Sequence, residues 1–164
     1  QGGIVKALVF AGPQRAEVAE LDEPTVGGNE VLVATRQVGI CHSDFDLLAD
    51  RYIIPVQFPI IPGHEWSGEV VEVGPEVRNV RPGDRIVGEC TVNGGADHFG
   101  FSISGAAAER FKIRADWAHR LPDELSCWLS NDEQHAVLGR ARTVITNRRF
   151  PVDGTGRRYP WPLV

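Results

Sequence analysis

The sequence predicts a mainly β domain with a barrel-like arrangement, and three observations lead to that fold class. Short apolar stretches rich in β-branched and aromatic residues recur along the chain. Turns rich in glycine and proline separate these stretches, and few segments have a helical pattern. Many short strands joined by such turns are typical of barrels and sandwiches rather than of helical folds.

The first 40 residues are expected to form strands. Four segments have the pattern, namely residues 4–10, 17–21, 31–35 and 38–40. Turn residues separate them at positions 12–13, 22–24 and 27–29. The last segment places Cys41 at the end of a strand, and Ser43 or Asp44 can then cap a helical turn that runs through Asp50.

The second half of the domain repeats this organisation after an irregular loop. Residues 51–62 combine large apolar side chains with three prolines, which remove ladder donors, so we expect a buried loop there. Further strands are expected at residues 69–73, 86–88 and 106–113, and the start of a helix at residues 121–126.

Size and composition fit one soluble globular domain. The chain has 164 residues, of which 42% are hydrophobic and 24% charged. No apolar run approaches about 18 residues, so neither a membrane span nor a membrane partner is expected. The three cysteines are widely scattered, which argues against a disulfide framework and for a cytoplasmic protein.

Charge is unevenly distributed along the chain. From Gln134 onward there are six Arg, no Lys and one acid, so the net charge of −5 leaves −10 on the rest. Nucleic-acid binding needs a basic stripe on the folded body, and this acidic body argues against it. We expect a domain at residues 1–147 and an Arg/Pro-rich tail at residues 148–164, either disordered or docked.

Cys41 and His64 are the residues most suggestive of chemistry. They are 23 positions apart, each in a short polar cluster beside strand-like sequence. Thiolate and imidazole are ligands that zinc prefers, and a catalytic zinc needs three protein ligands because the fourth place is kept for water or substrate. The alternatives are a small buried cysteine, a loop histidine, and a neighbouring Glu65 that forms a salt bridge.

The order and spacing of several motifs resemble the N-terminal, GroES-like catalytic domain of zinc-dependent medium-chain alcohol and polyol dehydrogenases. The resemblance runs from about Lys6 to Ser126. It is carried by Lys6-Ala7-Leu8-Val9-Phe10, Gly39-Ile40-Cys41-His42-Ser43-Asp44, Pro62-Gly63-His64-Glu65-Trp66-Ser67-Gly68-Glu69-Val70-Val71-Glu72-Val73-Gly74, Arg81-Pro82-Gly83-Asp84-Arg85-Ile86-Val87 and Leu121-Pro122-Asp123. It implies a GroES-like, partly open β-barrel with a few short helices.

The resemblance also implies roles for individual residues. Cys41 and His64 are expected to be the first two zinc ligands, and Glu65 to bind the metal or support a ligand. Ser43 is expected to relay the proton of the alcohol, and Asp44 to orient a ligand histidine. His42 is expected near the pyrophosphate of the cofactor.

The third zinc ligand is less well defined by the sequence. Glu133 matches the family position best, and His135 and Cys127 are alternatives. A structural zinc is not expected, because Cys90 is the only cysteine in the stretch where many relatives have four. Asp97 and His98 could imitate ligands there, but an exposed loop pair is the simpler interpretation.

The nicotinamide-binding domain of the family has no match in this sequence. Gly154-Thr155-Gly156 follows no predicted strand, so we expect no Rossmann domain and no dinucleotide site. Zinc cannot accept a hydride, so NAD(P) would be used only if another chain supplies its binding domain.

Three functions are therefore open. The first is an alcohol or polyol dehydrogenase module, inactive in hydride transfer alone. It would bind a small alcohol or polyol and either a separate cofactor-domain partner or further copies of itself. The second is a non-redox zinc enzyme, a lyase, isomerase or hydrolase, with Glu65 or Asp44 as base. The third is a metal-free interaction module that keeps only the fold.

Overall fold

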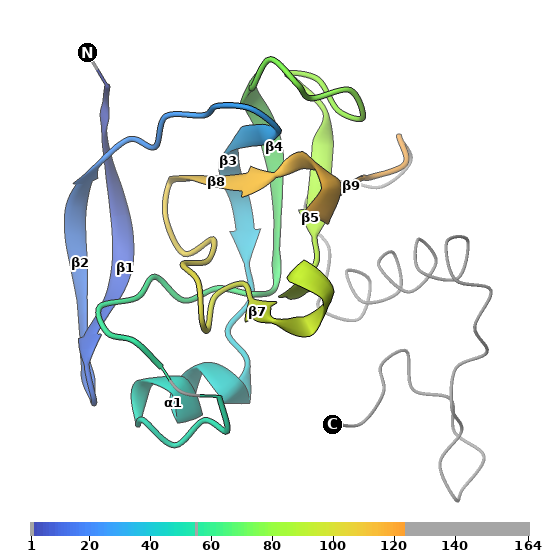
Figure 1. Cartoon of the computed structure of the whole chain (residues 1–164). Coiled ribbons are helices and arrows are strands. Elements are labelled where there is room, and N and C mark those ends of the chain that lie inside the picture. Colours follow the sequence, from blue (N-terminus) through green and yellow to red (C-terminus); the bar gives the residue numbers. More distant parts are fainter. Residues whose placement is uncertain (1, 55, 124–164) are drawn as a thin grey trace, which may run out of the picture.

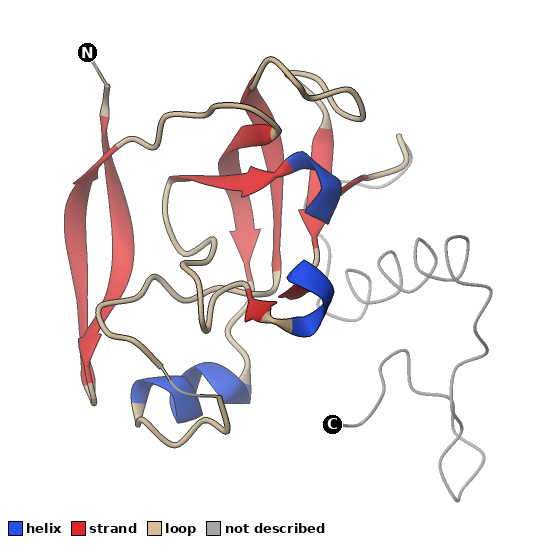
Figure 2. Cartoon of the chain, viewed as in Figure 1, coloured by secondary structure: helices blue, strands red, loops and turns tan. Residues whose placement is uncertain are grey.

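The computed structural model describes residues 2–54 and 56–123 and consists mainly of antiparallel strands (Figures 1 and 2). The predicted tail and the candidate ligands Glu133, His135 and Cys127 lie outside these residues. Strands β1 (Ile4–Gly12) and β2 (Arg15–Asp22) form a hairpin. A five-stranded sheet has the order β8-β3-β4-β5-β9, and no sheet of the described residues closes into a barrel.

The five-stranded sheet is built from β3 (Glu30–Val38), β4 (Trp66–Val73), β5 (Arg85–Gly88), β8 (Arg110–Arg114) and β9 (Ala118–Arg120). A small ribbon, β6 (Thr91–Val92) with β7 (Asp97–His98), contains the 3₁₀ turn Asn93–Gly95. A second 3₁₀ turn, Ala115–Trp117, leads into β9. The predicted mainly β fold is confirmed.

The core of the sheet forms around Trp66, which is 1% exposed. Its indole lies edge-on to the ring of Phe111 at 4.7 Å, and Phe99 packs beside both. A second apolar cluster contains Phe10, Leu47, Ile60 and Phe101, with Tyr52 and Cys90 packed against it. This second cluster joins the hairpin to the helix and the loops around the candidate site.

The one α-helix of the described residues is α1 (His42–Leu48), at the bottom of Figure 1. The sequence suggested Ser43 or Asp44 as its cap, and that expectation is wrong because the extended N-cap residue is Cys41. Asp44 instead occupies the third helical position, where its carboxylate accepts a hydrogen bond from the backbone N–H of Cys41 at 2.8 Å.

The predicted strand at 106–113 is divided in two. Only its second part enters the sheet, as β8. Its first part crosses to β1, where Ala108 forms a bridge with Ala7 and the carbonyl of Ala107 accepts from Leu8 N–H. This crossing segment ties the hairpin to the sheet. Among the residues that the structure describes, no helix has both the length and the apolar character needed to cross a bilayer.

Candidate metal centre

Strand pairing brings the two predicted zinc ligands together. Strands β3 and β4 are antiparallel, with Val38 opposite Trp66, so the end of one lies beside the start of the other. The N–H of Gly39 continues the ladder by donating to the carbonyl of Glu65 at 2.7 Å. Cys41 therefore leaves β3 next to the loop that carries His64 into β4.

Three side chains converge at this point. Cys41, His64 and Glu65 each offer one ligand atom, and these atoms lie within 4.8 Å of one another. The Oγ of Ser43 lies 3.3 Å from the sulfur of Cys41 and 3.4 Å from Nε2 of His64. Ligands around one tetrahedral zinc are about 3.5 Å apart, so a shift of about 1 Å would gather this group around an ion.

Asp44 lies on the other side of the imidazole. Its Oδ1 is 3.4 Å from Nδ1 of His64, and the two side chains are only 8% and 10% exposed. A proton on Nδ1 would face this carboxylate and leave the lone pair of Nε2 directed toward Cys41 and Glu65. That is the tautomer a metal-ligating histidine needs, so the donor set fits zinc.

Gly63 allows the loop before His64 to pack closely. Its φ is +98°, and a Cβ at this position would lie 2.7 Å from the backbone nitrogen of Ala107. The carbonyl of Gly63 accepts from Ala106 N–H at 2.9 Å, which fixes the loop against the crossing segment. A side chain here would displace His64, so the Pro-Gly-His order has a structural reason.

The phenol of Tyr52 is coupled electrostatically to two residues of the candidate centre. Burial raises the pKa of Tyr52, and the nearby thiol of Cys90, then Cys41 and Asp44, raise it further. Burial is the largest cause, because removing the phenol from water disfavours its charged form.

The remaining predicted residues lie apart from the three converging ligands. His42 is exposed on the first turn of α1, 88% by side chain, with Asp46 at 3.7 Å. The Sγ of Cys90 donates to the carbonyl of Phe99 at 3.7 Å and packs against the second apolar cluster. Asp97 and His98 form the two-residue strand β7 and are half-buried rather than exposed.

One residue of the site was missed in the sequence. The ring of Phe101 lies 4.5 Å from the ring of His64 at an angle of 41°. Phe101 follows β7 and is 37 positions from His64, with no metal-binding or catalytic group of its own. Only the fold of the loop brings it to the imidazole.

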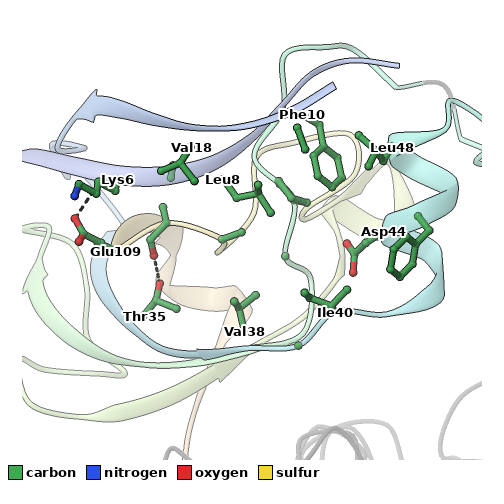
Figure 3. Close-up of a pocket in the computed structure, with 18 residues that line it drawn as sticks. Lys6, Leu8, Phe10, Val18, Thr35, Val38, Ile40, Asp44, Leu48 and Glu109 are labelled. Atoms are coloured by element: carbon green, nitrogen blue, oxygen red, sulfur yellow. Dashed lines mark hydrogen bonds between the residues drawn. The ribbon is translucent and has the colours of Figure 1, made fainter. Parts of the chain in front are cut away.

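An apolar cleft of about 540 Å³ adjoins the centre (Figure 3). It lies between the hairpin β1–β2 and the end of β3 with α1, and Asp44 and Gly63 belong to both cleft and centre. Its exposed apolar residues include Val18, Ile40 and Phe45. The hydroxyl of Thr35 donates to the backbone carbonyls of the crossing segment and closes one side.

Comparisons with known proteins point to one family. A family described as "Alcohol dehydrogenase GroES-like domain" matches residues 27–123. An alcohol dehydrogenase of Geobacillus stearothermophilus is 32% identical over 136 residues, covering 73% of this chain and 40% of that enzyme. A D-altritol 5-dehydrogenase of Agrobacterium fabrum is 32% identical over 166 residues, covering 86% of this chain and 49% of that enzyme.

Solved structures agree with these matches. The cobalt- and zinc-bound thermostable alcohol dehydrogenase of Pyrobaculum aerophilum superposes with a TM-score of 0.66 at 25% identity, covering 72% of this chain and 41% of that one. The chain therefore spans less than half the length of each of the three relatives.

Proposed function

Because the chain belongs to the alcohol dehydrogenase family whose GroES-like domain it carries, we propose that it holds the catalytic zinc of an alcohol or polyol dehydrogenase. The observation that carries the proposal is the convergence of Cys41, His64 and Glu65 within 4.8 Å, with Asp44 behind the imidazole. The zinc and cobalt of the Pyrobaculum relative support the choice of metal.

Cys41 and His64 would hold the metal, with Glu65 as the third group of the described residues. Glu133 is our proposal for a further ligand, with His135 and Cys127 as its alternatives, and all three lie outside the described residues. Bound zinc supplies Lewis acidity toward the oxygen of an alcohol or ketone.

Ser43 is our proposal for the group that relays the proton of the substrate hydroxyl. Its Oγ lies between the sulfur of Cys41 and Nε2 of His64, at 3.3 and 3.4 Å. A hydroxyl bound next to these two atoms would be within hydrogen-bond reach of Ser43, which can accept its proton and pass it on. His42, exposed at the start of α1, is our proposal for a contact with a cofactor phosphate.

Hydride transfer needs an acceptor that these residues do not provide. Oxidation of a secondary alcohol removes a hydride from carbon, and no protein side chain accepts one. We expect NAD(P) to be held by a nicotinamide-binding domain outside the described residues, and the described domain alone to be inactive in hydride transfer. Equilibrium titration with NADH tests this, and a submillimolar Kd for the purified chain would contradict it.

Zinc content tests the site directly. We expect about one zinc per chain in the wild type and in the control Cys90→Ser, and much less in Cys41→Ser and His64→Ala, because each removes a ligand. Equal zinc in all four proteins would refute the assignment, and a zinc-free wild type would favour the interaction module. Turnover without nicotinamide that chelator abolishes would favour the non-redox enzyme.

A further inference from the structure

Tyr52 and Phe101 form an aromatic stack beside the candidate centre, and the imidazole of His64 contacts Phe101 at a tilt of 41°. The ring of Tyr52 lies 4.5 Å from that of Phe101 and is tilted by only 12°, and Phe101 in turn lies 4.5 Å from His64. Phe101 is 2% exposed. The stack thus ends on the imidazole that the proposed function makes a zinc ligand.

Hydrogen bonds leave the orientation of this imidazole weakly defined. Nδ1 of His64 and Oδ1 of Asp44 are 3.4 Å apart, and neither atom has a hydrogen-bond partner among the described residues. The other oxygen of Asp44 accepts from the N–H of Cys41. At Nε2 the hydroxyl of Ser43 is 3.4 Å away, near the limit of a hydrogen bond.

Close packing of the loop that carries Phe101 fixes the position of His64, which these long contacts do not. Gly100 has φ of +83°, and a Cβ there would lie 3.0 Å from the backbone nitrogen of His64. The loop backbone therefore lies directly against the His64 backbone, and the N–H of Phe101 is fixed by the carbonyl of His98 at 3.0 Å. Leu47 and Ile60, both buried, belong to the same apolar cluster as Phe101.

We infer that Phe101 is a positioning residue for the metal centre and that Tyr52 supports it. The inference rests on the proposed zinc site. The ring of Phe101, tilted by 41° to the imidazole, restricts its rotation and keeps Nε2 directed toward Cys41 and Glu65. A smaller, non-planar side chain would let the ring turn, so His64 would have to be reoriented each time the metal binds.

Zinc affinity and the spectrum of bound cobalt test the inference. The variants are Phe101→Leu and the matched control Phe99→Leu, which is equally buried but packs on Trp66 and Phe111 instead of His64. Competition with a chromophoric chelator should show a zinc Kd raised about tenfold or more in Phe101→Leu, as for other groups that orient metal ligands. Phe99→Leu should stay within about threefold of wild type.

Cobalt(II) reports the geometry of its ligands without any turnover. We expect the visible absorption of the cobalt protein to change in Phe101→Leu and not in Phe99→Leu. Tyr52→Phe keeps a flat ring and should bind zinc as the wild type does, whereas Tyr52→Leu should weaken binding. Should Phe101→Leu fail to fold, the comparison of Tyr52→Leu with Tyr52→Phe decides in its place.

Failure of this inference and failure of the proposed function would give different results. Wild-type zinc affinity and an unchanged cobalt spectrum in Phe101→Leu, or in Tyr52→Leu where that variant decides, would overturn the role of the stack while the zinc site stands. A wild-type chain that binds neither zinc nor cobalt would overturn the proposed function and this inference with it.

Discussion

Replacing Gly88 with alanine should destabilise the domain through a single steric conflict. Gly88 ends β5, and a Cβ built on it would lie 2.2 Å from Cζ2 of Trp66. Carbon atoms in contact prefer about 3.5–4.0 Å, so one of the two groups must move by more than about 1 Å. The indole cannot move freely, because it is 1% exposed and Phe111 packs against it at 4.7 Å.

The expected cost follows from overpacking a rigid core. Extra methyl groups in well-packed cores cost about 1–3 kcal/mol, and the short contact places Gly88→Ala near about 3 kcal/mol. With a urea m-value of about 2 kcal/mol per molar, the unfolding midpoint should fall by about 1.5 M.

Urea unfolding followed by circular dichroism and tryptophan fluorescence measures this cost. Gly27→Ala is the matched control, since a Cβ at Gly27 meets nothing within 4 Å. The free energy of unfolding of this control should lie within about 0.5 kcal/mol of the wild-type value. If Gly88→Ala unfolded at the same urea concentration as Gly27→Ala, the contact with Trp66 would not limit the core and the reasoning would be refuted.

Three further predictions concern the loops and the sheet. Gly100→Ala should cost about 1–3 kcal/mol and weaken zinc binding, because of its φ of +83° and the approach to the His64 backbone; unchanged thermal stability and zinc affinity would contradict this. Thr35→Val should cost about 1 kcal/mol in urea unfolding, because its hydroxyl donates to backbone carbonyls beside the cleft, and no loss would mean that water replaces it. Although burial raises the pKa of Glu30, the hydrogen bond from Lys112 and other contacts leave it below 4.5. A carboxylate whose pKa is lower in the folded than in the unfolded protein stabilises the fold at pH values above its unfolded pKa. That stabilisation is lost as the pH falls through the folded pKa. Glu30→Gln should therefore unfold with a weaker dependence on pH below about 4.5, whereas an unchanged slope would exclude Glu30 as a contributor.

The local pattern of residues was enough to predict the type of fold and most of its strands. Alternating and β-branched segments mark β1 to β4 because a strand needs apolar side chains on one face only, which is a property of neighbouring residues. The same local logic failed at residues 106–113, where half of the segment leaves the sheet to pair with β1. That pairing depends on β1, which is about 100 positions away in the sequence, so no local pattern predicts it.

The helix cap shows the same limit on a smaller scale. Ser43 and Asp44 are better caps by residue type, yet Cys41 holds the position because β3 delivers the chain there in extended form. Asp44 then contributes from inside the helix, in reach of His64. Its assigned role toward the histidine stays a prediction, and the structure supplies the proximity on which it depends.

By itself, the sequence determined which groups could bind a metal and which family their motifs resemble, since both are matters of residue type and order. Tertiary structure alone decided that Cys41, His64 and Glu65 face one another, because the register of β3 against β4 closes the distance of 23 positions between the first two. It also decided that the ring of Phe101 lies 4.5 Å from the imidazole of His64. Packing of one loop on another depends on shape and distance across the whole fold, and no local pattern encodes it.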